Sequence, residues 1–245
     1  MAKDIKIYFL VFFLGSQTMI FELTLPRLLA PTFGNTLYCW TAAISVVLIG
    51  LSTGYFIGGL LSSKSSKSTT TLLWRLAAVS SFFSLVAGSI GGKLVHMLSH
   101  MGLIWGPLVS TCLLTLPSLI AGACVLPLAV TAVSNKLKPG KSSGRIYSIS
   151  TIGSVTGVLL TGYFLLPYFG INLTLYFATV PVFALVAISG KLLGVAIAIG
   201  LTFLFTVVDQ NILDKNTLMD KSNGFHQIKI VQDSNDKSIR MLFLD

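Results

Sequence analysis

The sequence has few charged residues, and acidic residues are almost missing from its first 208 positions. Charged residues make up 10% of the chain, and Glu22 is the only acid between Asp4 and Asp209. An ordinary soluble domain carries far more charge, so this composition excludes a soluble catalytic core within that region. Cysteine is also scarce. The three cysteines lie in or beside apolar runs without C-x-x-C spacing, and we interpret them as packing residues rather than metal ligands or disulfides.

Long apolar runs make up most of the first 208 residues. A membrane-spanning helix needs about 20 consecutive, mainly apolar residues. Seven segments meet this measure: 5–25, 37–61, 72–90, 105–133, 146–167, 171–189 and 191–208. The sequence therefore predicts an all-α polytopic membrane protein with about seven transmembrane helices over residues 1–208. The apolar run after Lys3 and Lys6 lacks a signal-peptide cleavage pattern, so it is interpreted as an uncleaved first span.

The basic residues predict the orientation of the chain in the membrane. The net charge is +9, but in a membrane protein an excess of Lys and Arg marks the cytoplasmic loops, so no nucleic-acid partner is expected. With the N-terminus inside, cytoplasmic segments hold ten basic residues, and only Arg27 and Lys93 lie on the other side. The ten are Lys3, Lys6, Lys64, Lys67, Arg75, Lys136, Lys138, Lys141, Arg145 and Lys191. We expect the lipid bilayer of a bacterial inner membrane as the surroundings, with a cytoplasmic N-terminus.

Small residues recur at every fourth position in three of the predicted spans. Such spacing gives a helix a smooth face that allows close approach of a neighbouring backbone. Ordinary helix packing explains the pattern, and helices that slide in a transporter are the alternative. A transporter would also need polar groups near the middle of the membrane, which are nearly absent from the sequence. The positions are Gly50, Gly54 and Gly58, then Ser80, Ser84 and Gly88, then Gly153, Gly157 and Thr161.

Glu22 is a candidate functional residue because an intramembrane carboxylate is costly unless it is paired or hydrated. Pro26 is expected to end or kink the first helix, which would let Arg27 turn back and pair with Glu22. Two interpretations follow: an ion pair that anchors the helix end, or a contact for a cation or amine at the mouth of the bundle.

His96 and His100 are one helical turn apart, a spacing found in metal sites. No third ligand is near them in the sequence, so we interpret both as surface or interfacial residues and expect no metal site.

The tail, residues 209–245, is polar and forms the second predicted unit. Its segment HQIKIVQD alternates apolar and polar residues, SND is typical of a turn, and SIRMLFLD is a second β-prone run. The sequence thus predicts a short C-terminal β-hairpin. An isolated hairpin is marginally stable in water, so it needs a sheet to join.

Two blocks of the membrane region and the tail resemble one family. The blocks are 22–61, which contains ELTLPRLLAPTFGNT, and 143–170, which begins SGRIYSISTIGS. They resemble bacterial membrane-bound spermidine synthase-like proteins, in which a transporter-like membrane region is fused to a polyamine aminopropyltransferase. The tail resembles the opening hairpin of that enzyme domain. The matching membrane positions are Glu22, Arg27, Pro31, Phe33, Gly34, Trp40, Gly58, Gly59, Gly144, Arg145, Tyr147, Gly153 and Ser154.

The resemblance implies a small set of site residues. Glu22, Arg27, Arg145 and Tyr147 are the candidates within the membrane region, and Gln227 corresponds to the glutamine that contacts the nucleoside of the aminopropyl donor. That donor, decarboxylated S-adenosylmethionine, is the co-substrate of the whole family enzyme. The glycine-rich loop and the acidic residues that catalysis requires have no counterpart in the sequence, so no cofactor and no catalytic residue is expected in this chain.

Three functions are therefore weighed. The first is a membrane domain that anchors or feeds an aminopropyltransferase-like enzyme domain, which a truncated gene lacks or a separate chain supplies. The second is a small-solute or amine transporter, for which Pro117 and Pro127 would interrupt the fourth span. The third is an inactive, truncated remnant. Seven spans from an inside start would place the tail outside, away from the cytoplasmic donor.

Overall fold

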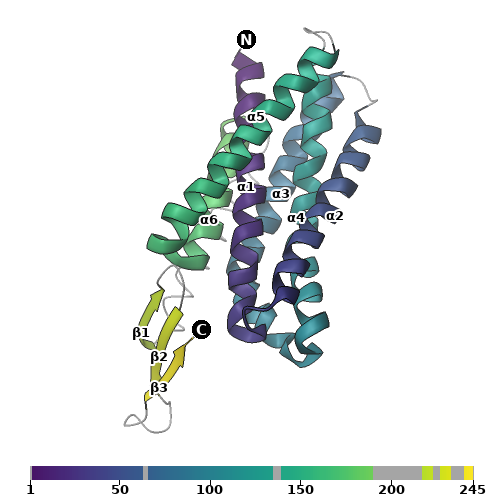
Figure 1. The fold of residues 1–245 in the computed structure, drawn as a ribbon. Coiled ribbons are helices and arrows are strands. Elements are labelled where there is room, and N and C mark those ends of the chain that lie inside the picture. Colours follow the sequence, from purple (N-terminus) through teal and green to yellow (C-terminus); the bar gives the residue numbers. More distant parts are fainter. Residues whose placement is uncertain are drawn as a thin grey trace.

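The structure is a computed structural model that describes residues 2–62, 66–134 and 139–189 and three strands between residues 217 and 244. Its helical part is a bundle drawn in Figure 1. The helices are α1 (Ala2–Phe33), α2 (Leu37–Leu61), α3 (Ser66–Met97), the 3-10 turn η1 (Ser99–Met101), α4 (Gly102–Ser134), α5 (Pro139–Leu160), the π-helical turn η2 (Thr161–Leu165) and α6 (Leu166–Ile188).

The bundle contains five helical stretches that are long and apolar enough to cross a membrane, counted over the described residues. They are 5–33, 37–61, 69–97, 99–134 and 140–188. This architecture is compatible with an integral membrane protein, as predicted. The prediction of seven separate spans is not supported. The predicted fifth and sixth spans lie within the single stretch 140–188. The predicted seventh span, 191–208, lies outside the described residues.

The long fifth stretch turns back on itself at Gly170. This glycine has φ 70° and ψ −174°, a conformation that a residue with a Cβ rarely adopts. Before it, Ile146 of α5 packs near the start of α1, and Leu165 of η2 packs beside the second half of α1. The turn at Gly170 therefore sends α6 back along the bundle.

The end of α6 lies beside the start of α1. Leu175 packs in the cluster that surrounds the second half of α1, whereas Val186 packs in the cluster around its first half. Lys6 Nζ donates a hydrogen bond to the carbonyl oxygen of Ile188, at 3.3 Å. Both ends of the bundle's chain, Lys6 and Ile188, thus meet at the same end of the bundle.

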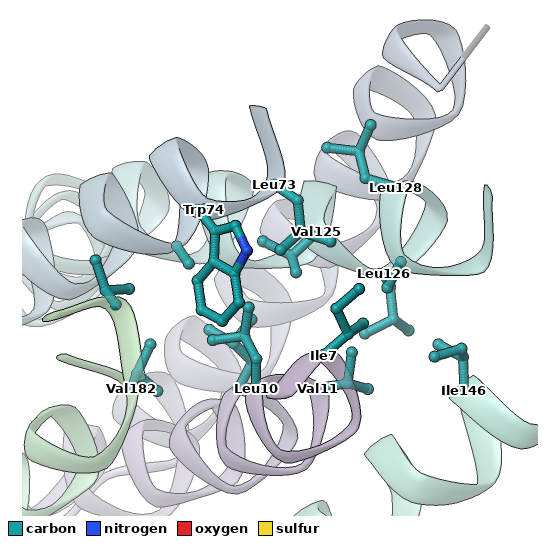
Figure 2. Close-up of a cluster of buried hydrophobic side chains, with 14 of the residues drawn as sticks. Ile7, Leu10, Val11, Leu73, Trp74, Val125, Leu126, Leu128, Ile146 and Val182 are labelled. Atoms are coloured by element: carbon teal, nitrogen blue, oxygen red, sulfur yellow. The ribbon is translucent and has the colours of Figure 1, made fainter. Parts of the chain in front are cut away.

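Two large clusters of apolar side chains hold the helices together. Figure 2 shows the first, in which Trp74 of α3 lies beside Leu10 of α1 and Val182 of α6. The second surrounds Ile20 and Leu29 of α1. Helix α1 contributes to both clusters, and it packs against α5 and α6, while α2 and α3 both pack against α4. The first helix is therefore the central element of the bundle.

Two of the three small-residue stripes pack as close helix contacts. On α2, a Cβ added at Gly54 or Gly58 would lie 2.6 Å from a carbonyl oxygen of α4. On α5, a Cβ at Gly153 would collide with the backbone of Phe12, and one at Gly157 would lie 2.6 Å from the carbonyl oxygen of Ser16. Such distances leave room for hydrogen alone, so these glycines allow backbones to touch.

Three strands follow the bundle: β1 (Thr217–Ser222), β2 (Gln227–Gln232) and β3 (Arg240–Leu244). They form an antiparallel sheet in the order β1-β2-β3. Strands β2 and β3 lie in the segment predicted as a hairpin, with Ile228 opposite Leu244 and Gln232 opposite Arg240. The turn residues, 233–239, lie outside the described residues, so the hairpin as a unit stays a prediction. Strand β1 was not expected from the sequence.

Candidate functional site

A chain of hydrogen-bonded polar side chains crosses the interior of the bundle. Gln17 comes from α1, Ser80 and Ser84 from α3, and Ser118 from α4. All four are buried, with exposed fractions between 0% and 5%. Gln17, Ser84 and Ser118 each lie near the middle of their apolar stretches. The chain therefore lies near the middle of the membrane that these stretches would cross.

The hydrogen bonds in this polar chain run in one direction. The Gln17 amide nitrogen donates to Ser84 Oγ at 2.5 Å, and the oxygens of Ser84 and Ser118 are 2.6 Å apart. Ser118 donates to the backbone carbonyl of Ser80 at 3.1 Å. Because a hydroxyl has a single hydrogen, Ser118 has none left for Ser84, so Ser84 is the donor in that pair. The donors therefore point from Gln17 toward Ser80.

The carbonyl oxygen of the Gln17 side chain, Oε1, has no hydrogen-bond partner among the described residues. A buried acceptor without a partner costs about 1–3 kcal/mol. Gln17 lines a cavity of about 10 Å³ together with Thr18, Ser80, Ser118 and Gly122. This volume is about what one water-sized group requires. The cavity thus has room for a single group that could satisfy Oε1.

A second cavity adjoins the first and is larger, at about 50 Å³. Leu14, Thr18 and Gly122 line both cavities. The polar side chains of the larger cavity are those of Thr18, Tyr55, Ser150 and Ser154. The two cavities are therefore neighbours that share walls formed by α1 and α4.

Two hydroxyls of the larger cavity have their hydrogens committed to backbone carbonyls. Thr18 Oγ1 donates to the carbonyl of Leu14 at 3.0 Å, and Ser154 Oγ donates to the carbonyl of Gly15 at 3.2 Å. A hydroxyl that has donated its hydrogen still offers lone pairs. Thr18 and Ser154, like Gln17 Oε1, therefore present hydrogen-bond acceptors to the cavities.

Glu22 is half-buried and lies one helical turn beyond Thr18, on the same side of α1. The expectation that Pro26 ends the helix is wrong, because α1 continues through Pro26 to Phe33. Residues five apart in a helix leave it about 140° apart, at about 100° per residue. Arg27 is exposed and has contacts of its own. The continuous helix therefore directs Glu22 and Arg27 to different sides of α1.

Pro26 also affects the backbone at Glu22. A proline has no N–H, so it cannot donate the helical hydrogen bond to the carbonyl four residues earlier. In α1 that carbonyl belongs to Glu22. In α4, Pro127 has the same effect on Ala123, which lines the larger cavity. The predicted interruption of this span by Pro117 and Pro127 is wrong, since α4 is continuous from Gly102 to Ser134.

The other sequence-predicted candidates lie apart from the polar chain. Arg145 and Tyr147 are exposed on α5. Tyr147 lies three and seven residues before Ser150 and Ser154, on the same side of the helix. His96 on α3 and His100 on η1 are both exposed. His100 Nδ1 is 2.9 Å from the Met97 carbonyl oxygen. The described residues hold no group of three metal-binding side chains.

Gln227 is the first residue of β2 and lies opposite Ser222 of β1. Its side chain is not among those described.

The free cysteines Cys39 and Cys124 are buried, and Cys112 is half-buried.

The sequence-based view that the middle of the membrane region is nearly without polar groups is wrong. Gln17, Ser84 and Ser118 lie in three separate apolar runs, and only folding brings them together. Ser80 and Ser84 were interpreted as part of a small-residue stripe. The signal that could have revealed the site is Gln17, which is the only glutamine in the first 208 residues.

Comparison of the chain with models of known protein families, with curated proteins and with solved structures finds no match.

Proposed function

We propose that this chain is the membrane unit of a polyamine aminopropyltransferase-like protein, and that it anchors or feeds an enzyme domain through its C-terminal strands. The observation that carries the proposal is the antiparallel pairing of β2 and β3 in the segment that resembles the opening hairpin of that enzyme domain. The two resembling blocks of the membrane region support it further.

The proposed connection is strand addition to the sheet of the enzyme domain. In the order β1-β2-β3, β3 is an edge strand within the described part of the tail. The backbone of an edge strand can pair with a further strand from another domain. Gln227, at the start of β2, would then contact the nucleoside of decarboxylated S-adenosylmethionine, while the enzyme domain supplies the carboxylates that orient and deprotonate the amine.

A complementation experiment tests this function. An aminopropyltransferase domain that lacks its own opening hairpin is expressed together with the full chain, and transfer from decarboxylated S-adenosylmethionine to putrescine is measured in membranes. We expect activity with the full chain and none with a chain that lacks residues 226–245. Gln227→Ala should abolish most of the activity, whereas Gln232→Ala at the other end of β2 should not. Failure of the full chain to restore transfer would contradict the proposal.

The side of the membrane supplies a second test, because the donor is cytoplasmic. We propose that the N-terminus is cytoplasmic and that the membrane is a bacterial inner membrane. The hydrogen bond between Lys6 and Ile188 supports a common side for both ends of the bundle. Reporters fused at Ile188 and at Asp245 should then both score as cytoplasmic, and a periplasmic reporter at Asp245 would rule out access to the donor.

Transport of a small amine is the second candidate function, and the polar chain with its adjoining cavities favours it. Substrate sites of secondary transporters lie near the middle of the membrane between helices. Uptake of labelled putrescine by vesicles that contain the chain, and its loss in Glu22→Gln, would support transport. Equal uptake by empty vesicles would exclude it.

A further inference from the structure

We propose that the two neighbouring cavities beside Gln17 bind one small monovalent cation. The proposal deepens the second candidate function, but it requires binding alone and not transport. It is carried by the direction of the hydrogen bonds around the cavities, by the unpartnered oxygen of Gln17, and by the absence of basic residues among the lining residues of either cavity.

The hydrogen-bonding groups that line the cavities determine which kind of group can bind there. The hydroxyl hydrogens of Thr18 and Ser154 are committed to backbone carbonyls, and Gln17 donates one amide hydrogen to Ser84. Each of these side chains offers an oxygen with free lone pairs. An anion would find acceptors facing it at these three positions. These three oxygens favour an occupant that donates hydrogen bonds or carries positive charge, and the hydroxyls of Tyr55 and Ser150 in the larger cavity can act as acceptors as well as donors.

The hydrogen-bond chain increases the strength of the Gln17 side-chain oxygen as an acceptor. Hydrogen bonds in a chain polarise one another when all donors point the same way. The amide of Gln17 donates into Ser84, which donates into Ser118, which donates into the Ser80 carbonyl. Gln17 is therefore the acceptor end of this chain, and its Oε1 becomes a stronger ligand for a positive group than an isolated amide oxygen.

The charge of the nearby Glu22 and the volume of the smaller cavity favour a small cation. Glu22, the only acid between Ile5 and Ile188, lies one turn beyond Thr18 on the same side of α1. A carboxylate within a membrane is a functional candidate because its cost must be offset by a partner. The smaller cavity, of about 10 Å³, accommodates one water-sized group. An ammonium group and an alkali ion both have this size, and both bind to neutral oxygens.

The experiment measures cation-dependent stability of the purified full chain in detergent. Tm is followed by tryptophan fluorescence while ammonium, methylammonium, sodium or potassium chloride replaces choline chloride at constant ionic strength. A ligand that binds the folded state alone raises Tm with its concentration. We expect at least one small cation to raise Tm, and bulky choline, which has no N–H, serves as the reference.

Substitutions of the cavity-lining residues test whether a cation binds in the cavity. Gln17→Met preserves the shape of the side chain and removes its acceptor, so affinity should fall about tenfold or more, the size expected for a lost hydrogen bond to a charged group. Ser110→Ala removes another buried hydroxyl that lines neither cavity, and its affinity should remain within about twofold of the wild type, since no ligand contact is lost. If Gln17→Met does not fold, Thr18→Val tests the same lining and should weaken binding several-fold.

The choice of salt shows whether the bound cation is an ammonium group or an alkali ion. A response to ammonium and methylammonium without sodium or potassium assigns an amine site, and the reverse assigns an alkali-ion site; either result supports the proposal. Equal Tm in all four salts and in choline would overturn it, leaving water as the occupant. An unchanged affinity in Gln17→Met or Thr18→Val would overturn it as well. Uptake in vesicles is measured separately, so a chain that binds without transporting contradicts the transport function alone.

Discussion

Helix α1 has two contrasting interfaces, and both are built from small residues. Toward α5, backbones touch at Gly153 and Gly157, where no space is left for a side chain. Toward α3 and α4, Gln17 donates a hydrogen bond to Ser84, Ser84 is hydrogen-bonded to Ser118, and a cavity remains. Small residues thus serve two purposes: glycine brings backbones together, whereas serine at similar spacing places hydroxyls inside the bundle. Four substitutions sharpen this comparison, beginning with the largest expected effect.

Gly153→Ala should destabilise the bundle most. The added Cβ would collide with the backbone of Phe12, and backbone cannot move aside as a flexible side chain can. Overpacking of this kind costs about 1–3 kcal/mol, so Tm should fall clearly. Gly144→Ala, in the same helix but with open space around it, is the matched control and should leave Tm equal or higher. Similar losses in both variants would contradict close packing at Gly153.

Ser118→Val should cost about 2 kcal/mol, since a broken buried hydrogen bond leaves its partners unsatisfied. Ser84 would lose its acceptor and the Ser80 carbonyl its side-chain donor. Denaturation of the purified chain measures the loss. Thr156→Val, which removes a part-exposed hydroxyl bonded within its own helix, should cost much less. A loss equal to that of Thr156→Val would show that the polar chain contributes nothing.

Gln17→Met should change stability by about 1 kcal/mol or less in the absence of salt ligands. The substitution removes a hydrogen bond to Ser84, but it also removes an acceptor that lacks a partner among the described side chains. These two contributions have opposite signs. A large loss would mean that Oε1 is satisfied in the folded protein, and thermal unfolding in choline chloride provides the measurement.

Ser110→Ala should have the smallest effect and should be neutral or slightly stabilising. Ser110 is fully buried, and its hydroxyl has no partner in the described part of the chain. Deleting a buried polar atom without a partner removes a desolvation cost. A loss above about 1 kcal/mol would indicate a hydrogen-bond partner for this hydroxyl.

The sequence predicts the class of fold well and the number of spans poorly. Apolar length identifies the first four stretches, because each is separated by polar or glycine-containing connections. The predicted spans 146–167 and 171–189 end and begin on either side of Gly170, where one glycine reverses the helical run without a polar loop. The sequence-based prediction misplaces the end of α1, because Pro26 is accommodated within a helix that the bundle holds on several sides. Proline is a weaker stop signal in a membrane helix than in a soluble one.

The candidate site was predictable only in part. Glu22 stands out because any charge in an apolar run does, and the structure places it next to the cavity-lining side of α1. Gln17, Ser84 and Ser118 could not be grouped from the sequence, since 67 positions separate Gln17 from Ser84 and 34 separate Ser84 from Ser118. Hydrogen bonding between distant residues depends on helix rotation, which is decided by packing. The resemblance to a known family directed attention to Arg145 and Tyr147, which lie outside the polar chain.

The most direct test of a single connected polar chain is a double-mutant cycle between Gln17 and Ser118, which are connected through Ser84. Gln17→Met and Ser118→Ala are made alone and together, and unfolding free energies are measured under one condition. Residues in one hydrogen-bond network couple by about 0.5–3 kcal/mol, whereas independent sites add. We predict coupling of about 1 kcal/mol between Gln17 and Ser118, and additivity between Gln17→Met and Thr156→Ala. Additivity in both pairs would contradict the account.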